Sequence, residues 1–148
     1  MIEEIAIKIN GHIMKIDKED IYLIINRNIF ISSGYACYKY NNESFRLHRD
    51  ILKCSDDFEI DHINGDRLDN RRSNLRIATR SENSCNTVRK NNLSGQKGVS
   101  YLKHNKKWIA QISKNRKKYY LGCFESKFDA IKVYQDKAKE LHGEFAKW

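Results

Sequence analysis

The segment Asp61–Asn83, DHINGDRLDNRRSNLRIATRSEN, restricts the fold more than any other part of this 148-residue chain. Near its end, Thr79 and Glu82 have the spacing of a capping box, in which each side chain satisfies a backbone donor of the other, so a helix should begin here. A turn-rich polar stretch, NGDRLDN, precedes this helix. We therefore expect a strand, a loop, a short strand and a helix, with Asp61 and His62 at the end of the first strand.

The polar residues at the two ends of this segment suit metal-dependent chemistry. Asp61 and Asn83, the latter in the first turn of the expected helix, offer hard oxygen ligands of the kind that Mg²⁺ or Mn²⁺ prefers. The imidazole of His62 can accept a proton near neutral pH. An Asp-His pair taken alone is also compatible with a hydrogen bond inside a turn, so the other positions of the segment decide between the two interpretations.

The run DHIN-G-D-x-x-D-N-R-x-x-N-L-R resembles the ββα-metal core of HNH endonucleases, in the H-N-N variant of phage and intron-encoded homing nucleases. The resemblance implies that Asp61 and Asn83 hold one divalent ion, Mg²⁺ or Mn²⁺, and that His62 is the general base. It implies that Asn74 braces the loop and orients the histidine. Three arginines flank this site and are candidate ligands of the scissile or adjacent phosphates: Arg72, Arg76 and Arg80.

Charge is distributed unevenly along the chain. Residues 1–60 hold 8 Lys and Arg against 10 Asp and Glu, whereas residues 61–148 hold 20 against 9. A basic half of this kind favours a polyanionic partner, with double-stranded DNA as the first candidate, although a merely soluble basic surface has the same composition. Apolar runs long enough to cross a membrane and a basic signal-peptide start are both absent from the sequence, so we expect a cytoplasmic protein.

The cysteine spacing argues against a structural zinc. The four cysteines are at least 17 residues apart, and no Cys-x-x-Cys pair of the kind that holds zinc in many HNH proteins is present. We expect reduced, partly buried thiols.

The first 47 residues are predicted to form a small antiparallel sheet that supports the nuclease. Asn10-Gly11 is a two-residue hairpin signal. The expected strands are Ile5–Ile9, Ile13–Ile16, Tyr22–Ile25, Ile29–Ser32, Tyr35–Tyr40 and Ser44–Leu47, with a possible helical turn at Asp17–Tyr22. A short helix, Arg49–Lys53, should follow His48. That histidine is expected to pack behind the active site as a helper, or to be a hydrogen-bonded core residue.

The chain changes character after a polar linker, Arg89–Ser94, that follows a helix expected to end near Val88. Three strands are predicted at Gly98–Leu102, Trp108–Ser113 and Lys117–Leu121, followed by an amphipathic helix, Ser126–His142. Ser126 is the expected N-cap of that helix, and Gly143 the residue that ends it. Between Lys97 and Lys118 there are 8 Lys and Arg and no acidic residue.

This C-terminal part resembles the APETALA2/ethylene-response-factor DNA-binding domain through Lys97-Gly98-Val99, Trp108–Ile112, Leu121–Phe124 and the helix with Ala130, Tyr134 and Ala138. The resemblance implies a sheet that lies in the major groove. The DNA-contact candidates are Lys97, Ser100, Lys103, Gln111, Ser113, Lys117, Lys118 and Tyr120. Ser100, Leu102 and Ser113 stand where the plant proteins carry arginines, so a looser sequence preference is expected. Trp108 and Phe124 should be core residues beneath the helix.

These parts predict an α+β protein: a β-rich support (1–47), a ββα-metal core (about 58–88) and a three-stranded antiparallel sheet packed on one helix. The expected domains are an HNH endonuclease, residues 1–93, and a DNA-binding domain, residues 94–148. We expect a metal-dependent DNA endonuclease, of the homing type, that acts as a monomer or a homodimer. A single site per chain would nick one strand. A DNA-binding or regulatory protein with an inactive core is the alternative from another class, and structured RNA stays open as a substrate.

Overall fold

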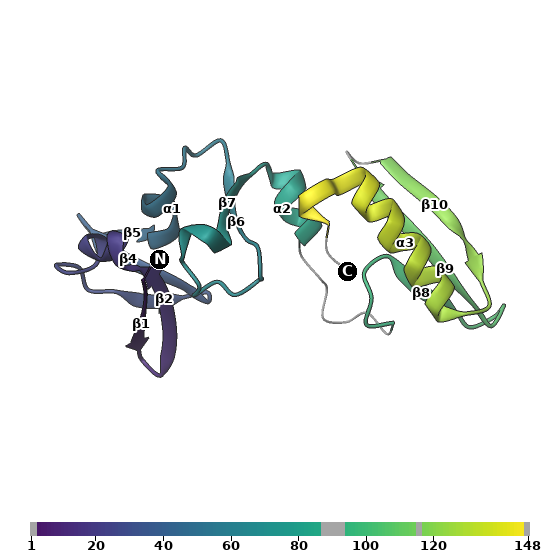
Figure 1. The fold of residues 1–148 in the computed structure, drawn as a ribbon, viewed down its shortest axis with the longest axis horizontal. Coiled ribbons are helices and arrows are strands. Elements are labelled where there is room, and N and C mark those ends of the chain that lie inside the picture. The colour runs from purple at the N-terminus through teal and green to yellow at the C-terminus, as the bar shows by residue number, and fades with distance from the viewer. Residues whose placement is uncertain (1–2, 87–93, 115–116, 147–148) are drawn as a thin grey trace. The chain divides into compact units, whose positions relative to one another are not determined.

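The computed structural model describes residues 3–86, 94–114 and 117–146, and the chain divides into two compact units, Met1–Arg80 and Ser81–Trp148 (Figure 1). The division falls at the first turn of a helix, α2 (Arg80–Asn86), and not at the linker predicted for residues 89–94. Residues 89–93 of that linker, and Val88, lie outside the described residues. Ser94 is buried in the second unit, where its hydroxyl donates to the backbone oxygens of Gln96 and Val99. The assignment of two functional domains stays a prediction.

Before the segment Asp61–Asn83, the chain of the first unit forms two small antiparallel sheets, whereas the sequence predicted one. A hairpin pairs β1 (Glu4–Ile9) with β2 (His12–Asp17), and a second sheet has the order β3 (Phe30–Ser32), β4 (Tyr35–Tyr40), β5 (Glu43–Arg46). The hairpin turn at Asn10-Gly11 is confirmed: both residues have positive φ, 48° and 85°. Such values are those of the two-residue turns that match strand twist.

Two local predictions in this unit are wrong. The strand expected at Tyr22–Ile25 is replaced by a 3₁₀ helix, η1 (Lys18–Leu23), and a turn in which the backbone N–H groups of Ile24 and Ile25 donate to the Ile21 oxygen. Tyr22 and Ile25 are more than 60% exposed, so no sheet recruits this β-prone stretch. Helix α1 (Leu47–Leu52) begins two residues before the predicted start at Arg49, because Leu47 and Ile51, four residues apart, both face the core.

The core of the first unit gathers side chains from most of these elements. Its buried members are at most 7% exposed and come from β2, β4, α1, β6 (Glu59–His62) and β7 (Leu75–Ala78): Met14, Ile16, Ala36, Leu47, Ile51, Ile60 and Leu75. Burial of each large apolar side chain stabilises the fold by about 1.5–3 kcal/mol. Because Ile60 and Leu75 belong to this cluster, the strands of the candidate site rest on the packed core.

The segment that we singled out in the sequence follows the predicted order of elements. β6 (Glu59–His62) pairs with β7 (Leu75–Ala78) in antiparallel fashion, with Asp61 opposite Arg76 and His62 opposite Leu75. A short 3₁₀ turn, η2 (Arg72–Asn74), leads into β7, and α2 begins directly after Thr79. The end of β6 therefore brings an acidic residue and a histidine to the start of one ordered loop.

The second unit is a three-stranded antiparallel sheet with a helix on one face (Figure 1). The strand order is β10 (Lys117–Phe124), β9 (Lys107–Lys114), β8 (Val99–Leu102), and α3 (Lys127–His142) covers the sheet before a final turn, η3 (Gly143–Phe145). The predicted cap is confirmed, since the Ser126 hydroxyl accepts from the backbone N–H groups of Phe128 and Asp129. Gly143 follows the helix with a φ of 53°.

The core beneath α3 explains one glycine and two aromatic residues. Its buried members are Val99, Ala110, Ile112, Ala130, Tyr134 and Ala138. Gly98 has a φ of +69°, and a Cβ there would lie 2.0 Å from the Tyr134 ring, so only glycine fits. Trp108 and Phe124 pack against this cluster, as predicted.

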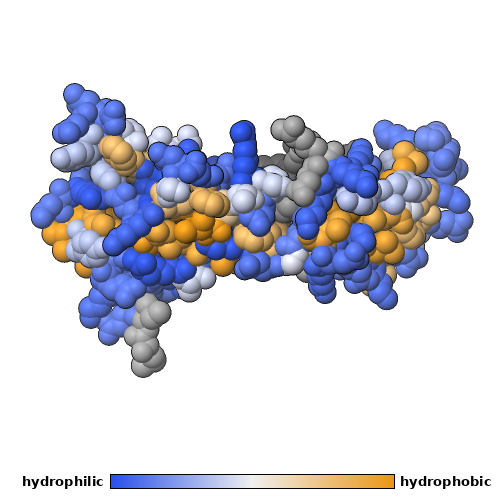
Figure 2. All heavy atoms as spheres, turned by 90° about the horizontal axis from the view of Figure 1, so that it is seen from above, coloured by the Kyte–Doolittle hydropathy of each residue, from blue (hydrophilic) through white to orange (hydrophobic). Residues whose placement is uncertain are grey.

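Both units have a largely polar surface. Figure 2 shows hydrophilic residues around smaller apolar areas on one face of the molecule. Among the described residues, none of the helices combines the length and the apolar character needed to span a bilayer.

Candidate active site

Asn74 holds together the two ends of the loop between β6 and β7. Its side-chain oxygen accepts from the backbone N–H of Asn64 at 2.9 Å, and its side-chain nitrogen donates to the backbone oxygen of Asp69 at 2.8 Å. The backbone adds a third bond, from the Ile63 N–H to the Asn74 oxygen at 2.9 Å. Asn74 is 7% exposed. Loss of its amide would therefore leave buried polar groups of the loop without hydrogen-bond partners.

A second polar centre, Asp69, fastens this loop from within. The Arg71 guanidinium donates to both carboxylate oxygens of Asp69 at 2.7 Å, and Asn64 donates to one of them at 2.8 Å. The hydrogen bonds from Arg71 keep the pKa of Asp69 below its ordinary value despite burial. Two backbone bonds with Lys15 of β2 flank Asp69, so the loop is also tied to the N-terminal hairpin.

Asp61 lies at the end of β6 and is 3% exposed. Its cross-strand neighbour Arg76 directs Nε and Nη2 at the Oδ2 atom, at 2.8 and 2.6 Å. The guanidinium thus provides the buried carboxylate with a cationic hydrogen-bond partner. Arg76, which the sequence offered as a phosphate ligand, is 13% exposed at its side chain and pairs with Asp61, and its contact with phosphate stays a prediction.

His62 follows Asp61 and lies in a cluster of rings. Its imidazole is 5.1 Å from the His48 ring, edge-on, and 6.0 Å from the Tyr35 ring, measured between centroids. Burial lowers the pKa of His62, against opposing effects of a hydrogen bond with Asn70 and of the nearby carboxylates. A neutral imidazole is the form that can accept a proton, and it is the form that this site favours.

His48 packs beside His62, which is compatible with both of the roles that the sequence left open, a helper behind the site or a core residue. It is 3% exposed, and burial, followed by the charges of His62 and two arginines, lowers its pKa to about 3. His48 therefore stays neutral at physiological pH and adds no charge next to the candidate base.

The remaining candidates of the HNH segment lie in different surroundings. Arg72 donates to both oxygens of the buried Asp20, at 2.8 and 2.6 Å, and its backbone N–H donates to Asp17. These bonds anchor the loop to η1, so the Arg72 guanidinium is held by the protein. Arg80 is exposed at the start of α2, and Asn83 is half-buried in the same helix, in the second unit. The joint role of Asp61 and Asn83 as metal ligands stays a prediction.

The sheet of the second unit has an open face opposite α3. Ala110 and Ile112 of β9 point to the helix, so their neighbours Gln111 and Ser113 occupy the other face. The register places Tyr120 beside Gln111 and Lys118 beside Ser113. Ser100 of β8 has the same parity, because Val99 is buried under α3. The DNA-contact candidates that share this open face are Ser100, Gln111, Ser113, Lys118 and Tyr120.

Three other DNA-contact candidates lie elsewhere in the second unit. Lys117 has the parity of the half-buried Tyr119, whose ring lies 5.4 Å from the Lys117 Nζ, and so leaves the sheet on the side of α3. Lys103 is exposed in the turn after β8. The Lys97 Nζ donates to the backbone oxygen of Ser84 at 3.0 Å. The sequence alone did not separate these lysines from Lys118.

Comparisons with known proteins relate this chain to a family and to two viral proteins. Residues 53–85 match the HNH endonuclease family. The protein named Uncharacterized HNH endonuclease L560, from Acanthamoeba polyphaga mimivirus, is 35% identical over 120 residues, which cover 77% of this chain and 62% of that protein. Protein 3.8 of Escherichia phage T7 is 34% identical over 92 residues, or 62% of this chain and 75% of that protein. The chain thus spans less than two thirds of the length of the mimivirus relative.

Proposed function

Because this chain belongs to the HNH endonuclease family, we propose that it hydrolyses phosphodiester bonds of double-stranded DNA at the end of β6. The observation that carries the proposal is the placement of His62, a buried histidine next to an ion-paired carboxylate, at the start of a loop held by Asn74. Such an arrangement gives a proton acceptor a defined position at low exposure to solvent.

In the proposed reaction, His62 takes a proton from a water molecule whose oxygen attacks the phosphorus. The bond from phosphorus to the 3′ oxygen breaks, that oxygen takes up a proton from water, and His62 releases its proton to solvent. The products are a 5′-phosphate and a 3′-hydroxyl. Asn74 acts on this step only through the loop, by keeping the backbone after His62 in place. His48 and Tyr35 pack on the imidazole and restrict its movement.

The donor set suits one divalent cation. Asp61 brings a charged oxygen and Asn83 a neutral one, and both are hard ligands that fit Mg²⁺ or Mn²⁺. A bound ion would supply positive charge next to the leaving oxygen and the pentavalent transition state. The pairing of Arg76 with Asp61 orients the carboxylate for this role.

The second unit is proposed to grip DNA through its open face. The support is threefold: the resemblance to the APETALA2/ethylene-response-factor domain, the helix-covered sheet, and the exposed Lys118 and Tyr120 on the uncovered side. Residues 94–148 hold 13 Lys and Arg against 5 Asp and Glu. Serine and lysine on this face favour phosphate contacts over bidentate readout of bases. A homing-type endonuclease, with cutting and binding in separate units, is the function that these features support best.

Incubation with supercoiled plasmid tests the proposal. A single site per chain should convert the plasmid to nicked circles in Mg²⁺ or Mn²⁺ and leave it intact in EDTA. A structured RNA, added as a competitor and as a substrate in parallel, separates the two nucleic acids. Tight binding without any cleavage in either metal would favour the alternative, a DNA-binding protein with an inactive core.

A further inference from the structure

Arginines of the first unit fall into two classes by their partners. Five of the eight are paired with a carboxylate at 2.6–3.1 Å: Arg27, Arg49, Arg71, Arg72 and Arg76. The other three have no carboxylate partner among the described residues: Arg46, Arg67 and Arg80. A paired guanidinium has its charge compensated within the protein. The second class is therefore where an external anion would be bound most strongly.

Two arginines of this second class converge on one tyrosine. The guanidinium carbon of Arg46, at the end of β5, lies 4.6 Å from the centre of the Tyr35 ring. That of Arg67, in the loop between β6 and β7, lies 4.7 Å from the same centre. Each such cation–π contact stabilises by about 0.5–1 kcal/mol at an exposed site. The Arg67 Nη1 also donates to the Ser33 oxygen at 3.0 Å, which further orients its planar fork.

The same tyrosine adjoins the candidate general base. The Tyr35 ring lies 6.0 Å from the His62 ring and 5.2 Å from the His48 ring. Tyr35 is half-buried, whereas Arg46 and Arg67 are exposed, so the ring forms a floor and the guanidinium groups face solvent. Two like charges held against one ring repel each other, and an anion bound between them would relieve that repulsion.

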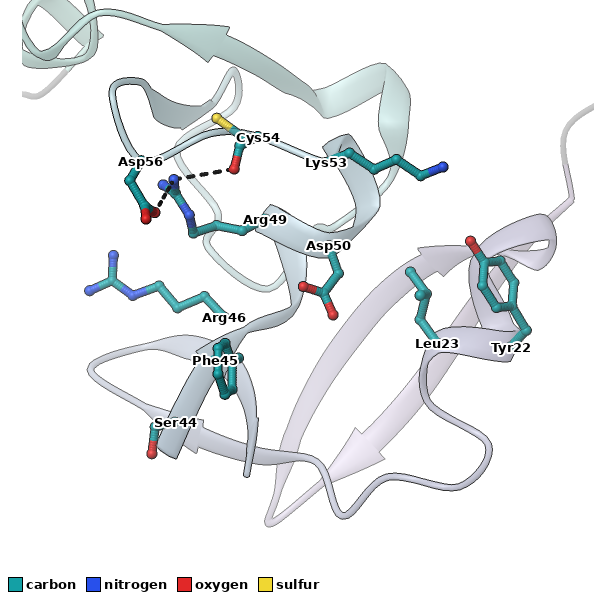
Figure 3. A pocket seen from close by; sticks show the side chains of 10 residues that line it. All are labelled: Tyr22, Leu23, Ser44, Phe45, Arg46, Arg49, Asp50, Lys53, Cys54 and Asp56. Atoms are coloured by element: carbon teal, nitrogen blue, oxygen red, sulfur yellow. Dashed lines mark hydrogen bonds and ion pairs between the residues drawn. The ribbon is translucent and has the colours of Figure 1, made fainter. Parts of the chain in front are cut away.

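Arg46 and Arg49 line the same pocket but differ in their interaction partners. This pocket has a volume of about 770 Å³ and is lined by residues of η1, β5, α1 and the segment that follows α1 (Figure 3). In Figure 3, Arg49 is fixed by Asp56 and by the backbone oxygen of Cys54, whereas Arg46 extends beside them without an interaction among the residues drawn. Arg49 also donates to the backbone oxygens of Ser55 and Phe58. Arg49 therefore has a structural role, and Arg46 keeps its hydrogen-bond donors available on the surface.

We propose that Arg46 and Arg67, held on Tyr35, bind a backbone phosphate of the DNA strand next to the bond that His62 addresses. This inference rests on the proposed function and assigns its phosphate contacts to residues other than those expected from the sequence. Planar guanidinium forks match the geometry of a phosphate, with two donors from each. Tyr35 is the positioning residue, since it contacts the arginines and the base but carries no charge.

Binding of a fluorescein-labelled duplex by the full chain, followed by anisotropy in EDTA over a series of NaCl concentrations, tests this site without cleavage. Because both arginines bind one phosphate, the double variant Arg46→Gln/Arg67→Gln should lower the slope of log K against log salt by about 0.9, and each single variant should lower it by less. Lys39→Gln is the matched control, because it removes the same charge from an exposed position on β4. Its slope should equal that of the parent.

Steady-state nicking gives a second readout. Each glutamine variant should raise KM by about tenfold, as expected for one lost charge-assisted contact, with a smaller change in kcat. Tyr35→Leu should raise KM too, and Tyr35→Phe, which keeps the ring, should raise it less. The inference is overturned if both glutamine variants keep the parent's salt slope and KM. A parent that binds but never nicks would refute the proposed function, while the anisotropy series still decides the phosphate site.

Folding of each variant is checked by thermal melting. Should a glutamine variant fail that check, Arg46→Lys and Arg67→Lys decide the matter, since they keep the charge but lose the fork. Weaker binding at an unchanged salt slope is expected of them. Affinity equal to that of the parent would overturn the inference.

Discussion

Arg72 is predicted to be a structural residue, and its removal should destabilise the first unit. It pairs with Asp20, which is 1% exposed, and lies within reach of Glu19 at 3.1 Å. Arg72→Ala would leave the Asp20 carboxylate buried without its cation. Removal of one partner from a fully buried pair costs about 3–5 kcal/mol. Because the Arg72 side chain is 40% exposed, water can enter the gap, so we expect about 2–4 kcal/mol.

Urea unfolding measures this loss in a way that separates the two units. Residues 1–80 contain no tryptophan, so tryptophan fluorescence does not report on the first unit, and Trp108 reports on the second. Far-UV circular dichroism reports on both. The expected result for Arg72→Ala is an earlier transition by circular dichroism, with the tryptophan transition unchanged.

Two variants control for charge and for burial. Arg80→Ala removes the same charge from an exposed site and should change the free energy of unfolding by no more than about 0.5 kcal/mol. The double variant Asp20→Leu/Arg72→Met replaces the ion pair by apolar side chains and should recover most of the loss. The reasoning is refuted if Arg72→Ala unfolds at the parent's urea concentration, or if the double variant is less stable than the single one.

Three further predictions concern the sheet, a buried histidine and the metal. Lys118→Ala should weaken duplex binding and lower the salt slope by about 0.9, whereas Lys117→Ala, on the side of α3, should do so less; equal effects in anisotropy titrations would contradict the placement of the two faces. His48 has a pKa of about 3 when folded and 6.5 as its ordinary value, so the unfolded chain binds the proton first and stability falls as the pH drops below 6.5. Between pH 7 and pH 5 this costs about 2 kcal/mol, and a His48→Gln variant with the same acid dependence in urea titrations would count against it. Asp61→Ala should reduce activity and raise the Mg²⁺ requirement more than Asn83→Ala, because a carboxylate brings charge as well as an oxygen; activity titrations with Mg²⁺ that rank them the other way would remove Asp61 from the ligands.

Local signals in the sequence predict the parts of the fold that depend on local physics. The Asn10-Gly11 turn specifies its hairpin because both residues accept positive φ. Ser126 begins α3 by accepting backbone hydrogen bonds, and Gly143 ends it with a positive φ. Both effects depend only on neighbouring residues. At Tyr22–Ile25 the same approach fails, because strand formation there required a pairing partner that the fold does not supply.

The candidate site is less accessible to prediction from the sequence because its contacts join distant segments. Spacing indicated that Asp61, His62 and Asn74 belong together, but not that Arg76 lies opposite Asp61 in the β6–β7 register. The three segments that meet at Tyr35 come from β4, β5 and the loop after β6. Neither motif spacing nor charge distinguishes an arginine paired with an acid from one that is not. The sequence alone therefore offered Arg72 and Arg76 as phosphate ligands and gave no reason to consider Arg46 and Arg67.

The most direct test of the account is the rate of plasmid nicking in Mg²⁺ by the parent and by His62→Ala, with folding checked by circular dichroism and duplex affinity measured in EDTA. The account predicts that the variant binds DNA as the parent does and nicks it about 10²–10⁴ times more slowly, as expected for loss of a general base. Nicking by a folded His62→Ala protein at the parent's rate would contradict it.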